Sequence, residues 1–290
     1  MVASAGDDDT VTWRELWIET TRIVGDRARA RWLCEVASGS VDGDEFVARL
    51  DEAATVRMVS HLDAMTARLR AGEPLQYVLG EWGFRRITLA VDRRVLIPRP
   101  ETELVAEVAL EKASAVGPTR VVADLGTGSG AIGLSLAHEL PLEGTTVWIT
   151  DASLDALDVA RANISGLGRA GVNVRVAHGS WVDALPDDLS FDVIVSNPPY
   201  VADDSADLEA IVNDWEPHDA LFAGPDGLDD IRRIIADAPT RLRSGGWLVL
   251  EIGFDQGGAV AELLSAAGYV DVQVEPDLGG LDRIALGRRP

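Results

Sequence analysis

The chain has 290 residues, and its 48 acidic and 26 basic side chains give a formal net charge of −22 at neutral pH. This negative charge repels phosphate backbones and so disfavours a DNA-binding protein. A single cysteine excludes a disulfide framework, and the four histidines show no metal-ligand spacing, so we expect no metal. No apolar run approaches the roughly 20 residues that span a bilayer, and the first ten residues lack a signal-peptide core, so we expect a cytoplasmic protein.

Residues 11–71 carry apolar side chains at helical spacing and no convincing strand pattern. Trp13, Leu16 and Trp17 give the first example, and breaks at residues 25–26 and 38–43 divide the region. We predict a bundle of about four helices, whose tryptophans form core rather than a platform for a ligand. We assign residues 1–78 to this N-terminal helical domain.

A β-hairpin is predicted next. Apolar and polar residues alternate over residues 84–91, and a second apolar run at residues 94–98 follows a short polar turn. We assign residues 79–100 to this hairpin, which would link the helical bundle to the rest of the chain.

Strands and helices alternate through the remaining residues, 101–290, which we assign to one domain. Such alternation predicts an α/β fold, with a mostly parallel sheet covered by helices on both faces. The link at residues 279–280 is too short for a helical crossover, so the last strand should be antiparallel. The expected strands are residues 121–125, 147–150, 174–177, 191–196, 247–252, 269–274 and 283–287, and the expected helices are residues 131–139, 154–163, 203–215, 228–242 and 256–267.

A glycine-rich turn follows the first of these strands, with Gly126, Gly128 and Gly130 in a G-x-G-x-G pattern. Glycine permits a tight turn and a close approach of ligand to backbone. Asp151 ends the next strand about 20 residues later, where a carboxylate can bind the hydroxyls of a ribose. The negative charge of Asp124 would repel a pyrophosphate, but it would attract an amino group and a positive sulfur. The turn therefore favours S-adenosylmethionine over NAD.

The sequence S-N-P-P-Y at residues 196–200 leaves the fourth strand beside this turn. Two prolines make the segment stiff and extended. Asn197 Oδ1 and the Pro198 carbonyl can accept the two hydrogens of a planar NH2 group, and Tyr200 can stack on that group. Holding the nitrogen in this way would favour methyl transfer to an amide by orientation. The alternative is a rigid loop in which Asn197 only caps a helix.

Together these motifs resemble the bacterial HemK/PrmC family, over about residues 70–290. The resemblance implies a class I S-adenosylmethionine-dependent methyltransferase that methylates the glutamine of the Gly-Gly-Gln loop in class 1 peptide chain release factors. It also implies that the N-terminal bundle helps to hold the release factor. The segments that carry the resemblance are residues 74–82, 95–103, 124–132, 196–200, 221–228 and 248–253.

The family pattern implies a role for each matching position. The turn would line the S-adenosylmethionine site and Asp151 would hold the ribose, while Trp181 would contact the adenine or, alternatively, plug the edge of the domain. Asn197 would contact both cofactor and glutamine. The full set of implied site residues is Gly126, Thr127, Gly128, Ser129, Gly130, Asp151 and Trp181 for the cofactor, and Asn197, Pro198, Pro199 and Tyr200 for the substrate. Position 180, often acidic in such enzymes, is Ser180 here.

Two features near the hairpin have alternative interpretations. Residues 97–103 contain prolines that end the hairpin and acidic residues that suit a first helical turn, but they could also form a wall of the active site. Five arginines form either a solvated face or a surface strip that would bind an acidic partner. These are Arg85, Arg86, Arg93, Arg94 and Arg99.

Rival functions remain at this point. A ribosomal-protein glutamine methyltransferase would use the same chemistry, and the catalytic motifs do not separate it from a release factor enzyme. A DNA adenine methyltransferase would need phosphate contacts and a base-reading module, which the charge and the length disfavour. An NAD-linked oxidoreductase leaves Asn197 without a role, and the intact motifs disfavour a non-catalytic binding module. We expect a monomer that binds neither DNA nor a membrane.

Overall fold

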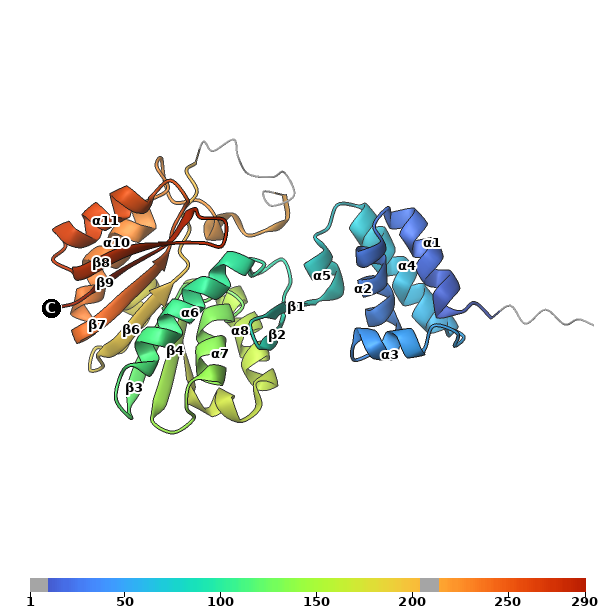
Figure 1. Ribbon diagram of the computed structural model, residues 1–290, viewed down its shortest axis with the longest axis horizontal. Helices are drawn as coiled ribbons and strands as arrows, with labels where there is room; N and C mark the ends of the chain where they lie inside the picture. Colours follow the sequence, from blue (N-terminus) through green and yellow to red (C-terminus); the bar gives the residue numbers. More distant parts are fainter. Residues whose placement is uncertain (1–9, 204–213) are drawn as a thin grey trace, which may run out of the picture. The chain divides into compact units, whose positions relative to one another are not determined.

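The computed structural model describes residues 10–203 and 214–290 (Figure 1). The chain forms two compact units that divide between Gly80 and Glu81. Most of the helix expected at residues 203–215 lies outside the described residues. None of the helices in the described ranges is long and apolar enough to cross a membrane.

The first unit is helical and begins with well-capped helices. Thr12 and Glu15 form a reciprocal capping box at the start of α1, and Asp26 accepts two backbone hydrogen bonds at the start of α2. Four of the described helices lie within residues 11–71, as the sequence predicted, and a short fifth helix follows them. The five are α1 (Trp13–Val24), α2 (Arg27–Ser38), α3 (Gly43–Ala48), α4 (Val56–Arg70) and α5 (Leu75–Leu79).

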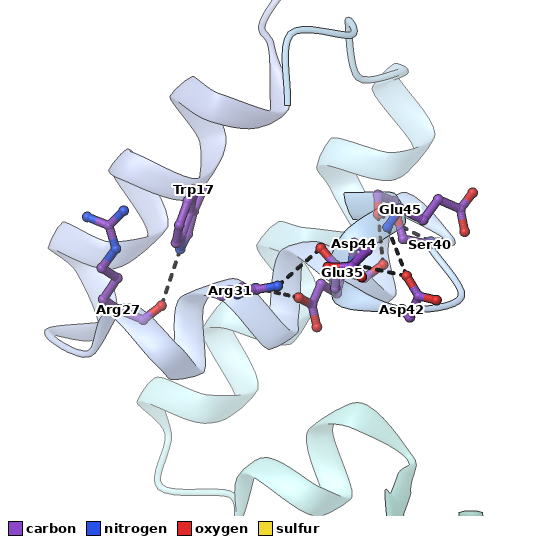
Figure 2. A network of polar contacts seen from close by, with 10 residues as sticks. Trp17, Arg27, Arg31, Glu35, Ser40, Asp42, Asp44 and Glu45 are labelled. Carbon is purple, nitrogen blue, oxygen red and sulfur yellow. Dashed lines mark hydrogen bonds and ion pairs between the residues drawn. The ribbon is translucent and has the colours of Figure 1, made fainter. Parts of the chain in front are cut away.

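The tryptophans of this unit differ in burial. Trp13 is fully buried, and the rings of Trp13 and Trp17 both meet Phe46 edge to face. Trp32 is 41% exposed, so the prediction that the tryptophans form the core is wrong for this residue. Figure 2 shows polar contacts of this unit, including the Trp17 indole on the Arg27 carbonyl, which joins α1 to α2, and the ion pair of Arg31 with Glu35 within α2.

The hairpin lies in the second unit and differs from the one predicted. Strand β1 (Glu81–Phe84) pairs antiparallel with β2 (Ile87–Ala90), so the turn falls at residues 85–86. Residues 94–98 form no strand, and the prediction of one there is wrong. Residues 85–86 are two arginines between apolar residues, and arginine is not a usual turn residue, so the sequence does not mark the turn. Arg94 instead bonds to Asp92 through both backbone and side chain.

The sheet of the second unit has seven strands in the order β5-β4-β3-β6-β7-β9-β8. Neighbours from β5 to β7 run parallel, whereas β9 pairs antiparallel with both β7 and β8. The predicted fold class is therefore confirmed. The strands are β3 (Arg120–Leu125), β4 (Thr145–Asp151), β5 (Val174–His178), β6 (Phe191–Ser196), β7 (Leu242–Glu251), β8 (Val270–Pro276) and β9 (Asp282–Arg288).

Helices cover both faces of this sheet. Ala123 and Leu125 of β3 join the apolar core beneath α10 and α11, whereas Asp124, on the opposite face, meets α7. The helix expected over residues 228–242 ends early, because α10 gives way to a short 3-10 turn at residues 238–240 and β7 begins at Leu242. The helices are α6 (Pro100–Ser114), α7 (Ala131–Glu139), α8 (Leu154–Gly166), α10 (Asp229–Asp237) and α11 (Gly257–Ala266).

The strand order reverses between β3 and β6, which are adjacent although two strands separate them in sequence. Ligands of open α/β sheets bind at such a point, beyond the carboxyl ends of the strands. Leu125 is paired with Ser196 there, so the glycine turn and the Asn-Pro-Pro-Tyr segment start side by side.

Candidate active site

A cavity of about 550 Å³ lies at the carboxyl ends of the central strands. The parts of the chain that line it include the glycine turn after β3, the end of β4, the segment after β5 and the start of the segment after β6. Of the residues that the sequence predicted for a site, those that line this cavity are Gly126, Thr127, Gly128, Ser129, Asp151, Trp181, Asn197 and Pro199. Gly130, Pro198 and Tyr200 lie outside the lining.

Three positions of this turn require glycine, because their φ angles are positive. Gly126, Gly128 and Gly130 have φ angles of 68°, 55° and 91°, in the region that other residues rarely adopt. A Cβ atom on Gly128 would meet no other atom within 4 Å, so the backbone there is open to a ligand. A Cβ atom on Gly130 would lie 2.7 Å from Leu134, so this glycine serves the close packing of α7 instead.

Asp124 is a buried acid at the wall of the cavity. Its Oδ2 accepts from the Thr127 hydroxyl at 2.6 Å and from the Gly133 backbone at 2.8 Å. Among the described residues, Oδ1 has no hydrogen-bond partner. Burial raises the pKa of this carboxyl to about 7. An acceptor left free beside an open glycine turn fits a ligand with a cationic amino group, as S-adenosylmethionine has.

Asp151 joins the end of β4 to the glycine turn. Its Oδ2 accepts from the Gly128 backbone at 2.9 Å, and its Oδ1 accepts from the Ser153 backbone at 2.8 Å. Each oxygen keeps a further lone pair, so the carboxylate can also accept the two hydroxyls of a ribose. Burial raises the pKa of Asp151, because the surrounding atoms exclude water from the charge.

Trp181 forms a rigid side of the cavity. Its φ angle of 47° is rare for a large residue, and its indole N–H donates to Asp230 at 3.1 Å. A Cβ atom on Gly126 would lie 2.9 Å from the ring, so the indole is packed directly on the glycine turn. The ring thus presents a flat apolar surface at the cavity where a nucleobase could stack.

Asn197 lies at the cavity immediately after β6. Its Nδ2 donates to the hydroxyl oxygen of Thr102 at 3.3 Å, and the described residues engage its Oδ1 in no hydrogen bond. The amide oxygen is therefore available as an acceptor. Pro198 is buried behind it, and the Tyr200 hydroxyl donates to Glu251 at 3.2 Å. Tyr200 is thus held by an acid at the end of β7, and it does not line the cavity in which it was expected to stack on the substrate.

The segment before α6 also contributes to the cavity, through Arg94, Val95, Leu96, Pro98 and Thr102. Both interpretations of residues 97–103 thus apply, because the same prolines and acids also begin α6. Thr102 and Glu251, which contact Asn197 and Tyr200, were not predicted as site residues from the sequence. The signal available was their presence in two segments that carry the family resemblance, residues 95–103 and 248–253.

The five arginines near the hairpin have partners within their own unit. Arg85 pairs with Glu107 and Glu139, Arg86 also approaches Glu139, and Arg94 pairs with Asp92. The remaining two are Arg93, over the ring of Trp215, and Arg99, which pairs with Glu216 at 2.5 Å. These contacts favour a structural role for the arginines over a surface strip that binds an acidic partner.

The seven-stranded sheet, the open glycine turn and the acids at the ends of β3 and β4 define a class I S-adenosylmethionine-dependent methyltransferase. A family model described as the methyltransferase small domain matches residues 102–214, and one described as the PrmC N-terminal domain matches residues 18–80. The chain belongs to the release factor glutamine methyltransferase family, and this confirms the resemblance found in its motifs.

Curated relatives with the name release factor glutamine methyltransferase support this membership. The relative from Pseudomonas aeruginosa is 48% identical over 226 residues, which cover 78% of this chain and 79% of the relative. The relative from Gloeobacter violaceus is 39% identical over 283 residues, or 94% of this chain and 95% of the relative. Among solved structures, a methyltransferase from Pyrococcus furiosus supports the fold, with a TM-score of 0.52 and 18% identity over 78% of this chain and 98% of that chain.

Proposed function

We propose that this chain transfers the methyl group of S-adenosylmethionine to the side-chain amide nitrogen of the glutamine in the Gly-Gly-Gln motif of a class 1 peptide chain release factor. The observation that carries the proposal is the placement of Asn197. Its Nδ2 donates one hydrogen to Thr102, which leaves Oδ1 as an acceptor, and the residue lines the cavity beside the glycine turn.

The chemistry makes orientation the main task of the protein. The lone pair of an amide nitrogen is delocalised, so the nitrogen is a weak nucleophile, and its pKa is too high for a general base to remove a proton at neutral pH. Asn197 Oδ1 and the Pro198 carbonyl would accept the two N–H hydrogens and aim the nitrogen across the cavity. Bound S-adenosylmethionine supplies an electrophilic methyl group on a positive sulfur.

Other residues of the cavity would hold the methyl donor. The backbone of the turn at residues 126–129 would approach its methionine part, Asp124 Oδ1 would accept from its amino group, and Asp151 would accept from its ribose hydroxyls. Trp181 would stack against its adenine.

We also infer how the partner is recognised. The helical domain, residues 1–78, would hold the release factor while residues 101–290 perform the transfer. A substrate that acts on the ribosome places the enzyme in the cytoplasm. We infer a monomer without a DNA or membrane partner, because the net charge of −22 repels phosphate groups.

The test is to map the methylated residue. The protein is incubated with labelled S-adenosylmethionine and, separately, with a release factor, ribosomal proteins and DNA. The expected label is on the release factor, at the glutamine of its Gly-Gly-Gln motif, and is absent from a release factor that carries alanine at that position. Label on DNA, on a ribosomal protein alone or on a residue other than glutamine would contradict the proposal.

A further inference from the structure

A buried carboxylate joins two segments that lie more than a hundred residues apart in the sequence. Glu216 Oε2 accepts from the backbone N–H of Ile97 at 3.0 Å, and Glu216 Oε1 accepts from the Arg99 guanidinium at 2.5 Å. The Glu216 side chain is only 2% exposed, so water has little access to these bonds. Removing this carboxylate would therefore release the two segments from each other.

A second contact joins the same two segments, and both of them line the cavity. The Arg93 guanidinium lies over the ring of Trp215, 4.9 Å from its centroid. The residues beside these contacts form parts of the cavity wall, and they include Val95, Leu96 and Pro98 in the first segment and Pro217, Asp219 and Ala220 in the second. The contacts of Glu216 thus set where these two parts of the wall lie relative to each other.

The first of these segments is also bound to Asn197. Arg99 is the N-cap residue of α6, and Thr102 in the first turn of α6 accepts from Asn197 Nδ2. The chain that leaves β6 through Asn197 is therefore bonded twice to the start of α6, once through Asn197 itself and again through Glu216. The acceptor amide and the wall at residues 217–220 share one support.

The wall joined by Glu216 belongs to the part of the cavity that the methyl donor is not proposed to contact. The donor would lie at the glycine turn, Asp151 and Trp181, whereas residues 95–98 and 217–220 line the cavity together with Asn197. The glutamine side chain is the ligand that remains for this part. Its amide is neutral and offers no charge for the protein to hold, so its orientation depends on fixed surroundings.

We infer that Glu216 is a positioning residue for the methyl transfer, because it holds residues 217–220 beside residues 95–98 and so shapes the part of the cavity that receives the glutamine. Glu216 does not line the cavity itself and acts through Ile97 and Arg99. This inference rests on the proposed function, which places the glutamine beside Asn197.

The chain offers a matched control at Asp192 of β6. Its Oδ2 accepts from the backbone N–H of Val121 at 2.7 Å, its carboxylate pairs with Arg243 at 2.7 Å, and its side chain is 9% exposed. Asp192 therefore makes the same kinds of bonds as Glu216, but it lies at the opposite end of β6 from Asn197. A loss of stability alone should affect variants of both acids alike.

The first test compares Glu216→Gln with Asp192→Asn in the full chain, using a full-length release factor and saturating S-adenosylmethionine. Each change keeps the shape and removes the charge that pairs with an arginine. We expect kcat/KM for the release factor to fall about tenfold or more in Glu216→Gln and to stay within about twofold of wild type in Asp192→Asn. The Kd for S-adenosylmethionine, measured by calorimetry, should stay within about threefold in both, which also shows that each variant is folded.

The second test approaches the same ion pair from Arg99, which is 31% exposed, and it decides the matter if Glu216→Gln does not fold. Arg99→Met should lower kcat/KM about tenfold. Arg99→Lys keeps a cation that can make the single bond to Glu216 and should stay within about threefold of wild type. Combining Glu216→Gln with Arg99→Met should lower kcat/KM by no more than about twofold beyond either change alone, because both remove one contact.

The outcomes separate this inference from the proposed function. Equal effects of Glu216→Gln and Asp192→Asn on kcat/KM, wild-type kcat/KM in Arg99→Met, or a Kd for S-adenosylmethionine that rises as much as kcat/KM falls would overturn the positioning role. The wild-type protein would still label the glutamine in each case, so the proposed function would stand. A wild-type protein that leaves the glutamine unlabelled would remove the proposed function and this inference with it.

Discussion

The backbone N–H of Gly128 donates to Asp151 Oδ2 at 2.9 Å, and this bond joins the turn after β3 to the end of β4. One carboxylate therefore shapes the cofactor turn and can also accept a ribose. Because both tasks need acceptor oxygens, Asp151 affects the turn and the ligand together.

Replacing this carboxylate should weaken cofactor binding. Asp151→Asn keeps the shape but turns one acceptor into a donor that faces the Gly128 N–H or a ribose hydroxyl. We expect the Kd for S-adenosylmethionine, measured by calorimetry, to rise by about tenfold or more, as for the loss of hydrogen bonds to a charged group. Asp158→Asn, in an exposed ion pair on α8, is the control and should leave the Kd unchanged. Equal Kd values for the two variants would exclude Asp151 from the site.

Adding a methyl group at Gly126 should disturb the turn and the indole together. Gly126→Ala places a Cβ atom 2.9 Å from the Trp181 ring at a φ of 68°, so both contact and conformation oppose it. We expect a loss of about 1–2 kcal/mol in the free energy of unfolding and weaker cofactor binding. Urea denaturation measures the first effect. Gly166→Ala, where a Cβ would meet nothing within 4 Å, should leave both values unchanged.

Most of the second unit could be predicted from the sequence, because the sequence patterns that specify its strands and turns are local. The period of each strand, the glycines of the turn and the prolines after Asn197 place these residues at one edge of a parallel sheet. The hairpin was predicted with the wrong strands, since its turn uses Arg85 at a φ of 49° instead of a glycine or asparagine. The contacts that hold Arg85 there come from Glu103 and Glu139, on helices outside the hairpin.

The contact behind Asn197 could not be predicted for a similar reason. Thr102 lies in the first turn of α6 and Asn197 follows β6, and nothing in either local pattern says that their side chains meet. Only the packing of α6 on the sheet brings them together. The sequence therefore indicated Asn197, which lines the cavity, and gave no sign of the threonine that bonds to it.

The ion pair of Arg85 should be a main support of the hairpin. The Arg85 guanidinium bonds to Glu139 at 2.6 Å, and the two side chains are only 12% and 7% exposed. Arg85→Met leaves the buried Glu139 with only the longer approach of the exposed Arg86, and we expect a loss of about 3 kcal/mol in the free energy of unfolding, measured in urea. Arg161→Met, in an exposed pair with Asp158, should cost less than about 1 kcal/mol. Similar losses for both variants would show that the Arg85 pair has no special structural role.

The buried acid at the end of β7 should make stability depend on pH. The pKa of Glu251 is about 7 in the folded protein and near 4.5 when the side chain is exposed. Between these values the folded state holds a proton that the unfolded state has lost, so this group lowers the free energy of unfolding as the pH rises. Glu251→Gln removes that dependence. From about pH 4.5 to pH 7 the variant should gain up to about 3 kcal/mol relative to wild type.

Urea denaturation of both proteins across this range checks that prediction. The difference between the two free energies of unfolding should change steadily with pH and level off above about pH 7. A difference that stays constant with pH would mean that Glu251 titrates normally in the folded protein.

The most direct measurement of the central claim is the turnover of Asn197→Ala with a release factor at saturating S-adenosylmethionine. Loss of the acceptor that orients the glutamine nitrogen should lower kcat by at least about 100-fold, while the Kd for S-adenosylmethionine stays within a few-fold of wild type. A variant that binds the cofactor normally and still methylates the glutamine at close to the wild-type rate would contradict the account.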